Sequence, residues 1–372
     1  MFFLIFAAAV PAQTNLVVTN GSKASVRVRE SRVNIWADPP PANMVFDRWI
    51  GDTTLVEDPT SASSFVNPVS KNIALTATYK PAPAWSLTEE TINGVDVLYY
   101  IPPTPVGIIF RFHGSGGSAQ STLSSIESRI FSNDAVAAGY GIIALDSSDR
   151  VTGDWSFLPP ANNPDITNVQ AVITNFLQRG IISSDDPIVA QGTSRGGVFS
   201  SMAAYFLNFK ADAIYIGFAV DAVMPVTTVP TIFCAAANDD QDLVGPVGNQ
   251  RAHDQAVSLQ NRGVMASFNQ HPATPVYPER FWRLANFTET DSHNIYNALK
   301  TGGFLDGRNV RIDNPRNTNW QSVIPTQYLP YSSGISTILG SSYANHSFFS
   351  DYNSRVLRFY AAALAASKQR SR

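Results

Sequence analysis

The sequence predicts an α/β protein with a mostly parallel central sheet, preceded by a small all-β module. Residues 187–207 have the pattern of a buried strand that runs through a Gly-x-Ser-x-Gly turn, centred on Ser194, directly into a helix. Residues 106–118 form a second apolar run, which ends in a glycine-rich turn. Residues 14–80 instead alternate apolar and polar side chains between Gly, Pro and Asn, as short strands do.

The N-terminus has the character of a secretory leader. Residues 1–12 are apolar over about ten positions and end in small residues, which predicts signal-peptidase cleavage after Ala12. The segment lacks Lys and Arg, and the alternative is a first buried strand. The apolar run is far shorter than the ~20 residues that span a bilayer, so we expect no stable membrane insertion. We therefore expect a secreted, extracellular bacterial protein.

Composition excludes several classes of partner and cofactor. The chain has 372 residues, 44% of them hydrophobic and 15% charged, which is enough to bury a large core. The net charge of −3 gives no reason to expect a nucleic acid or an anionic membrane as partner. The sequence has no His-Glu-x-x-His motif, no phosphate-binding Gly-Lys-Ser/Thr loop and a single cysteine, Cys234. We therefore expect no metal and no organic cofactor.

The module at 14–80 resembles the divergent B-repeat of internalin type, which bacteria attach to secreted and surface proteins. The resemblance rests on Ala-Asp-Pro at 37–39, Phe-Asp-Arg-Trp at 46–49, Gly-Asp at 51–52 and Ala-Thr-Tyr-Lys at 77–80. It implies a contact with polymer or with the cell surface through exposed aromatic residues such as Trp36 or Trp49. For Trp49 we favour a place in the small core instead, because small domains need their large aromatic residues inside. Residues 81–85 predict a short stiff linker to a catalytic domain at 86–372.

The turn at Ser194 is the strongest chemical signal in the chain. A serine on so sharp a strand-to-helix turn adopts a strained backbone, and the flanking Gly192 and Gly196 remove side chains that would collide there. Apolar residues precede the turn and recur at helical spacing after it, which favours a nucleophile over a glycine-rich turn with a passenger serine.

The glycine-rich turn after residue 112, His-Gly-Ser-Gly-Gly, predicts an oxyanion loop. Such a loop offers a backbone N–H to the oxyanion, and we expect this donor to be Ser115 or Gly116. The second N–H would come from Arg195, the residue after the nucleophile. The alternative for such a turn, taken alone, is a phosphate cradle.

These two motifs, in this order, resemble the α/β-hydrolase superfamily, and within it the secreted esterases and polyester depolymerases with a His-Gly oxyanion motif. The resemblance covers roughly residue 85 to the C-terminus and implies the chain order serine, acid, histidine. The expected strand at 231–237 is followed by three acids. Asp239 is our first choice for the triad acid and Asp240 is nearly as favoured, whereas we expect Asp242 to cap the next helix.

The resemblance also guides the choice of histidine. His346 precedes an amphipathic segment that has the pattern of the terminal helix, and we assign it the role of general base. His271 is the main rival because it follows a predicted last strand. Preferring His346 makes residues 272–340 an insertion suited to a lid or pocket wall. His293, in that insertion, is a weaker candidate, and we expect His253 on an exposed helix face.

The loop after residues 141–146 carries Trp155 and Phe157 on the expected active-site side of the sheet. They favour a cleft for aryl or polymeric acyl groups, with ordinary loop packing as the equally favoured alternative. The sequence therefore predicts a secreted, serine-dependent carboxylic ester hydrolase that acts through an acyl-enzyme. Its substrate class stays open among polyesters, acylated polysaccharides and lipidic esters. The alternatives are a serine peptidase on the same fold and a non-catalytic surface adhesion protein.

Overall fold

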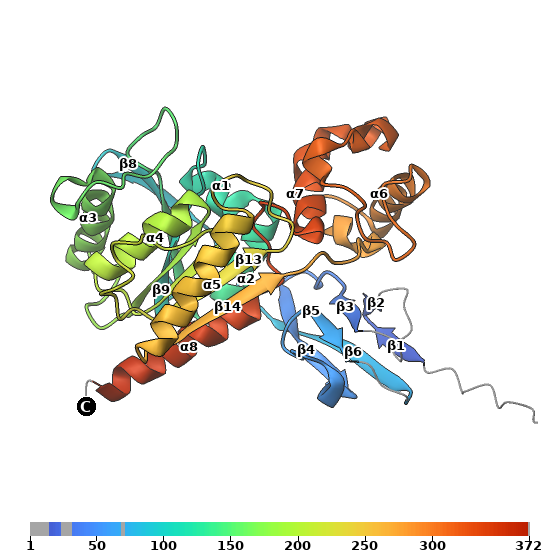
Figure 1. Ribbon diagram of the computed structural model, residues 1–372, viewed down its shortest axis with the longest axis horizontal. Coiled ribbons are helices and arrows are strands. Elements are labelled where there is room, and N and C mark those ends of the chain that lie inside the picture. Colours follow the sequence, from blue (N-terminus) through green and yellow to red (C-terminus); the bar gives the residue numbers. More distant parts are fainter. Residues whose placement is uncertain (1–14, 24–31, 68–70, 371–372) are drawn as a thin grey trace, which may run out of the picture.

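The computed structural model of the protein describes residues 15–23, 32–67 and 71–370 (Figure 1). The expected signal peptide at 1–12 and residues 24–31 of the predicted all-β module lie outside the described residues. Within the described residues no helix is both long and apolar enough to cross a membrane.

The predicted α/β architecture with a mostly parallel central sheet is confirmed. Eight strands form one sheet in the order β14-β13-β12-β11-β9-β10-β8-β7. Their bounds are β7 Thr88–Ile92, β8 Val95–Tyr100, β9 Gly107–Phe112, β10 Tyr140–Leu145, β11 Ile188–Thr193, β12 Asp212–Tyr215, β13 Thr231–Ala236 and β14 Ala266–His271. Strands β9 to β14 run parallel, and β7 and β8 add an antiparallel edge. In the parallel part, the carboxyl ends of the strands therefore meet at one edge, where such sheets bind ligands.

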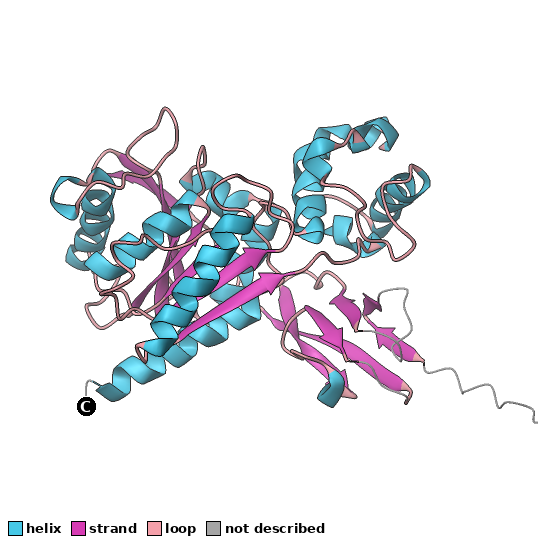
Figure 2. Cartoon of the chain, viewed as in Figure 1, coloured by secondary structure: helices cyan, strands magenta, loops and turns pink. Residues whose placement is uncertain are grey.

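Helices cover both faces of the sheet, as Figure 2 shows. The helices are α1 Ala119–Ser124, α2 Ile126–Ala137, α3 Pro164–Gln178, α4 Arg195–Phe206, α5 Pro246–Asn261 and α8 Asn353–Arg370. One core packs α1, α2 and α8 against the sheet, and another packs α3 and α4 against its other face. Strands β9, β10 and β13 are buried along their whole length, because a parallel sheet covered on both faces has no solvent side.

The N-terminal module consists of two three-stranded sheets, β1-β6-β4 and β2-β3-β5. Its strands are β1 Leu16–Thr19, β2 Gly21–Lys23, β3 Val33–Ala37, β4 Met44–Gly51, β5 Ser63–Val66 and β6 Ile73–Pro81. Trp36 and Trp49 are both buried. The expected exposure of Trp36 is therefore wrong, whereas the favoured place of Trp49 in the small core is confirmed. Trp49 lies in the module's own core, where its indole N–H donates to the Ser61 carbonyl. A buried indole needs such an acceptor for its N–H.

The segment between β14 and α8 forms a helical unit with its own hydrophobic core. It contains α6 Glu289–Thr301, α7 Ser332–Tyr343 and short 3-10 turns, including Pro278–Arg283 and Pro315–Asn317. The unit contacts the N-terminal module. The Trp36 ring stacks on Tyr277 at 6.0 Å between centroids, and the Tyr277 hydroxyl donates to Asn34 Oδ1 at 2.8 Å.

Candidate active site

Ser194 lies on a strained turn between β11 and α4. Its backbone angles are φ 55° and ψ −123°, a combination that a non-glycine residue adopts only when its surroundings enforce it. A Cβ on Gly192 would lie 2.1 Å from the Gly196 carbonyl oxygen, and one on Gly196 would lie 2.2 Å from the His113 carbonyl oxygen. Only glycine fits at these two positions. The turn therefore lifts the Ser194 hydroxyl above the carboxyl end of the sheet.

The structure brings Ser194, His346 and Asp239 together. The Ser194 Oγ lies 2.8 Å from His346 Nε2, and His346 Nδ1 lies 2.7 Å from Asp239 Oδ2. Because a carboxylate only accepts, the Nδ1 carries the proton and Nε2 is free to accept the serine proton. Asp239 is fully buried and its other oxygen accepts the Gln241 backbone N–H at 3.1 Å. The arrangement is that of a serine nucleophile, a base and an acid that orients the base.

The other two acids of this turn lie elsewhere. Asp240 does not face the imidazole, because its Oδ2 accepts a hydrogen bond from Asn314 Nδ2 at 2.8 Å. The expectation that Asp240 is an alternative triad acid is therefore wrong. The side chains of consecutive residues in an irregular turn point in different directions, so only one of these two carboxylates reaches His346. Asp242 does not cap the following helix, because α5 begins after Gly245; Asp242 lines the cavity in front of Ser194.

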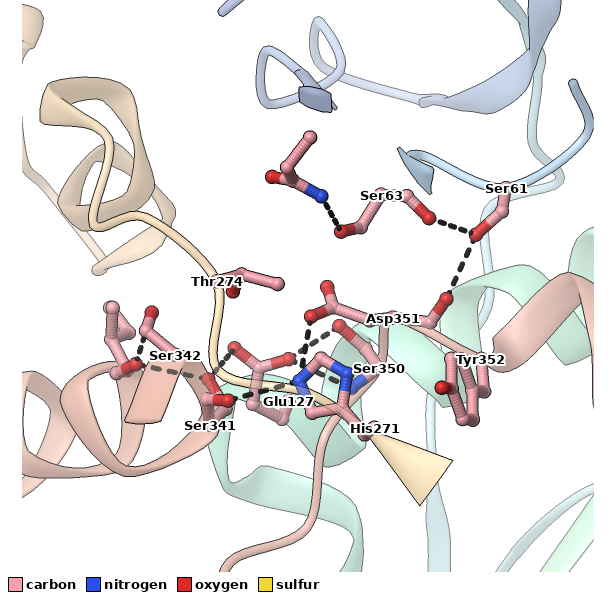
Figure 3. Close-up of polar contacts among 12 residues, drawn as sticks. Ser61, Ser63, Glu127, His271, Thr274, Ser341, Ser342, Ser350, Asp351 and Tyr352 are labelled. Carbon is pink, nitrogen blue, oxygen red and sulfur yellow. Dashed lines mark hydrogen bonds and ion pairs between the residues drawn. The ribbon is translucent and has the colours of Figure 1, made fainter. Parts of the chain in front are cut away.

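His271 is part of a different, buried cluster (Figure 3). Its Nε2 lies 3.1 Å from the Ser341 carbonyl oxygen and 3.2 Å from Asp351 Oδ2, and its ring stacks on Phe349. Burial lowers the pKa of His271, which keeps the ring neutral. Arg280 Nη2 also donates to both carboxylate oxygens of Asp351, each at 3.1 Å. His271 therefore lies in this buried cluster and not beside Ser194, so the alternative that made it the general base is wrong.

Two other histidines lie on helix surfaces. His293, on α6, is 42% exposed and lies 3.6 Å from Glu279. His253, on α5, is 50% exposed, as expected for a histidine on an outer helix face.

The glycine-rich loop after β9 faces the nucleophile. Ser115 lines the cavity beside Ser194, whereas the Gly116 N–H donates to the Gly153 carbonyl at 3.2 Å. The Gly116 N–H is therefore already paired, which favours Ser115 of the two expected donors. Arg195 is the first residue of α4, where backbone N–H groups have no acceptor within the helix. Its guanidinium lies 3.2 Å from Asp154, and Asp154 also accepts from the Ser115 hydroxyl.

Trp155 does not line the cavity, contrary to expectation. It is 2% exposed, and its indole N–H donates to the His113 carbonyl at 2.8 Å. His113 in turn donates from Nδ1 to the Gly114 carbonyl and accepts the Ser147 N–H at Nε2. Burial lowers the pKa of His113, so the neutral ring can do both. Trp155 and His113 thus hold the glycine-rich loop after β9 in place, a role that was not expected from the sequence.

An open cavity of about 660 Å³ lies in front of Ser194. Phe157 lines it, as expected, and the guanidinium carbon of Arg195 lies 4.9 Å from the Phe157 ring centre. Sequence reasoning missed the other apolar lining residues, which are Val198, Ile216, Phe218, Leu243, Val244 and Phe348. Leu243 is 77% exposed at the rim. Such a cavity favours an apolar group next to the reacting bond.

The nucleophile follows β11, the acid follows β13, and the histidine precedes the last helix of a sheet with helices on both faces. This is the α/β-hydrolase fold. Within the described residues no group of three or more His, Cys, Asp or Glu side chains could hold a metal ion.

No family model matches the sequence, and no curated protein matches it. Among solved structures, a thermostable carboxyl esterase from Bacillus coagulans is 13% identical, with a TM-score of 0.38 over 51% of this chain and 90% of its own. An esterase from Pyrococcus furiosus is 12% identical, with a TM-score of 0.38 over 50% and 82% of the two chains. A carboxylesterase from Bacillus cereus is 12% identical, with a TM-score of 0.36 over 48% and 85%. These structures are similar to about half of this chain.

Proposed function

We propose that this protein is a secreted, serine-dependent carboxylic ester hydrolase that works through an acyl-enzyme on Ser194. The observation that carries the proposal is the hydrogen-bonded series from Ser194 Oγ through His346 to Asp239, at 2.8 Å and 2.7 Å. The series opens onto a cavity with a largely apolar wall. A positioned base and a serine on a strained turn are what nucleophilic acyl transfer requires.

The reaction follows from which atoms donate and accept. His346 Nε2 takes the Ser194 proton while Oγ forms a bond to the ester carbonyl carbon, and Asp239 stabilises the charged imidazole. The N–H groups of Arg195 and Ser115 hold the oxyanion. The C–O bond to the alcohol then breaks, and His346 Nε2 returns the proton to the leaving oxygen. Water repeats the sequence on the acyl-enzyme and releases the carboxylic acid.

The test is hydrolysis of p-nitrophenyl butyrate by the protein from residue 13 onward, beside its Ser194→Ala variant. We expect activity in the first and none above background in the second. A fluorophosphonate probe supplies a second readout, because it labels only an activated serine. A protein that is neither active nor labelled would favour the adhesion alternative, and cleavage of amides in preference to esters would favour the peptidase.

We further propose that the substrate is polymeric, a polyester or an acylated polysaccharide. Support comes from the open cavity and from Leu243 at its rim, which an extended substrate could contact. The N-terminal module remains a candidate for contact with polymer or cell surface, through residues other than Trp36 and Trp49. Binding of the inactive Ser194→Ala protein to polyester film, with and without residues 14–80, would test both points. Secretion is tested by N-terminal sequencing of protein from the culture medium, which should begin at Gln13.

A further inference from the structure

One side chain of the helical insertion touches both catalytic loops. Asn314 donates from Nδ2 to Asp240 Oδ2 at 2.8 Å, and its Oδ1 accepts from Asn345 Nδ2 at 3.0 Å. Asp240 is the residue directly after the acid Asp239, and Asn345 is the residue directly before the histidine His346. A single amide therefore links the neighbour of the acid to the neighbour of the base.

A second residue of the same turn holds the histidine backbone. Arg316 donates from Nη2 to the His346 carbonyl oxygen, and its backbone N–H donates to Asn314 Oδ1 at 3.0 Å. The second bond caps the 3-10 turn Pro315–Asn317 and fixes the Asn314 side chain. Asn314 is 7% exposed and Asn345 is 1% exposed, so water competes little for these bonds.

The geometry points to Asn314 as a positioning residue for the series Ser194, His346, Asp239, with Arg316 as its support. The inference rests on the proposed function. In this view the insertion clamps the two catalytic loops together, because it reaches them through Asn314 and Arg316.

None of the insertion's residues lines the described cavity in front of Ser194, so the structure gives no support to the expected lid or pocket wall.

The clamp matters because both catalytic side chains lie on irregular loops. Asp239 follows β13 without a helix of its own, and His346 lies between α7 and α8. A displacement of about 1 Å at a reacting group can cost about a hundredfold in rate. The same displacement would leave substrate binding nearly unchanged, because neither Asn314 nor Asp240 lines the cavity. Loss of the clamp should therefore lower kcat and spare KM.

The experiment exchanges the partners of one hydrogen bond. Asn314→Asp keeps the acceptor for Asn345 and for the Arg316 N–H but sets a carboxylate against Asp240. The double variant Asp240→Asn/Asn314→Asp restores the bond with the donor on the other side and has the net charge of the natural chain. Asn317→Asp is the matched control, since it makes the same change at an exposed position of the same turn. Asp240→Asn alone keeps an acceptor opposite Asn314 and serves as the fourth corner of the cycle.

All proteins are compared on p-nitrophenyl butyrate, with active sites counted by stoichiometric fluorophosphonate labelling so that kcat refers to labelled sites. We expect kcat of Asn314→Asp to fall about ten- to a hundredfold with KM within about twofold. The double variant should recover to within about threefold, and Asn317→Asp should match the natural chain. Unchanged kcat per labelled site in Asn314→Asp, or no recovery in the double variant, would overturn the clamp alone. A natural chain that is neither labelled nor active would overturn the hydrolase itself, and with it the clamp.

Discussion

Asp212 is a buried carboxyl group beneath the helix that carries the nucleophile. It opens β12 and is 1% exposed. Its Oδ2 lies 3.1 Å from Ser200 Oγ, which also lies 2.9 Å from the Gly197 carbonyl oxygen on α4. A hydroxyl has one proton and cannot donate to both. Both contacts are satisfied when Asp212 is protonated and donates to Ser200 Oγ, while Ser200 donates to Gly197.

The charge state of Asp212 sets a pH dependence of stability. Burial raises the pKa of Asp212 to about 8, against an unfolded value of about 4. Between these values the folded protein binds a proton that the unfolded chain has lost, so the free energy of unfolding falls as the pH rises. Each pH unit removes about 1.4 kcal/mol, which amounts to roughly 3 kcal/mol between about pH 5 and pH 7. Below about pH 4 the contribution is constant, and above about pH 8 no further loss occurs.

The variant Asp212→Asn isolates this effect, because its neutral amide has nearly the same shape and can donate to Ser200 Oγ. Urea unfolding at several pH values, followed by tryptophan fluorescence, gives the stability of variant and natural chain. We expect the variant to gain about 3 kcal/mol relative to the natural chain between about pH 5 and pH 7. Asp185→Asn, at an exposed position, is the control. A stability difference that stays constant over this range within about 1 kcal/mol would show that folding does not raise the pKa of Asp212.

Four further substitutions test other parts of the molecule. Asp239→Asn keeps the shape but loses the orientation of the imidazole, and kcat per labelled site should fall by about three to four orders of magnitude; a loss under about tenfold would exclude Asp239 as the acid. Phe157→Ala should impair bulky aromatic esters more than acetyl esters, whereas Trp155→Ala should cost about 3–5 kcal/mol in urea unfolding; equal losses on both esters for Phe157→Ala would contradict its place in the cavity. Asp351→Ala leaves Arg280 buried without its carboxylate and should cost about 3–5 kcal/mol in the same assay, and a cost under about 1 kcal/mol would contradict this account of the cluster.

The features that the sequence could predict depend on neighbours along the chain. The turn at Ser194 is defined by residues within two positions of it, so a strand, two glycines and a helix suffice to recognise it. The same holds for the glycine-rich loop after β9 and for the largely apolar strands, whose burial on both faces predicts a parallel sheet. The order serine, acid, histidine is implied by the family resemblance, and it narrowed the candidates for the triad acid and for the general base to a few residues each.

The remaining choices depend on directions that a sequence does not record. Asp239 and Asp240 are adjacent and chemically identical, and only the course of the turn decides that one faces His346 and the other faces Asn314. Trp155 has an apolar ring and one N–H donor, which suit a cavity wall and a buried support equally. It is buried because its N–H finds an acceptor in the His113 carbonyl, and the sequence does not show that these two groups meet. Asn314 has a local signal only as the cap of its own turn, because the two partners near the catalytic residues lie 74 and 31 residues away.

The burial of Trp36 ties the N-terminal module to the active site through the insertion. The Trp36 ring stacks on Tyr277, and the guanidinium carbon of Arg283 lies 4.6 Å from the ring centre, so both of these partners belong to the insertion. Detaching the module would expose Trp36 and leave the Tyr277 hydroxyl without its bonds to Asn34. The insertion is also the segment that holds Asp240 and Asn345 through Asn314. A module that only tethered the enzyme to a polymer would not need this buried contact. Removing the module should therefore lower the free energy of unfolding of the catalytic unit, even where no polymer is present.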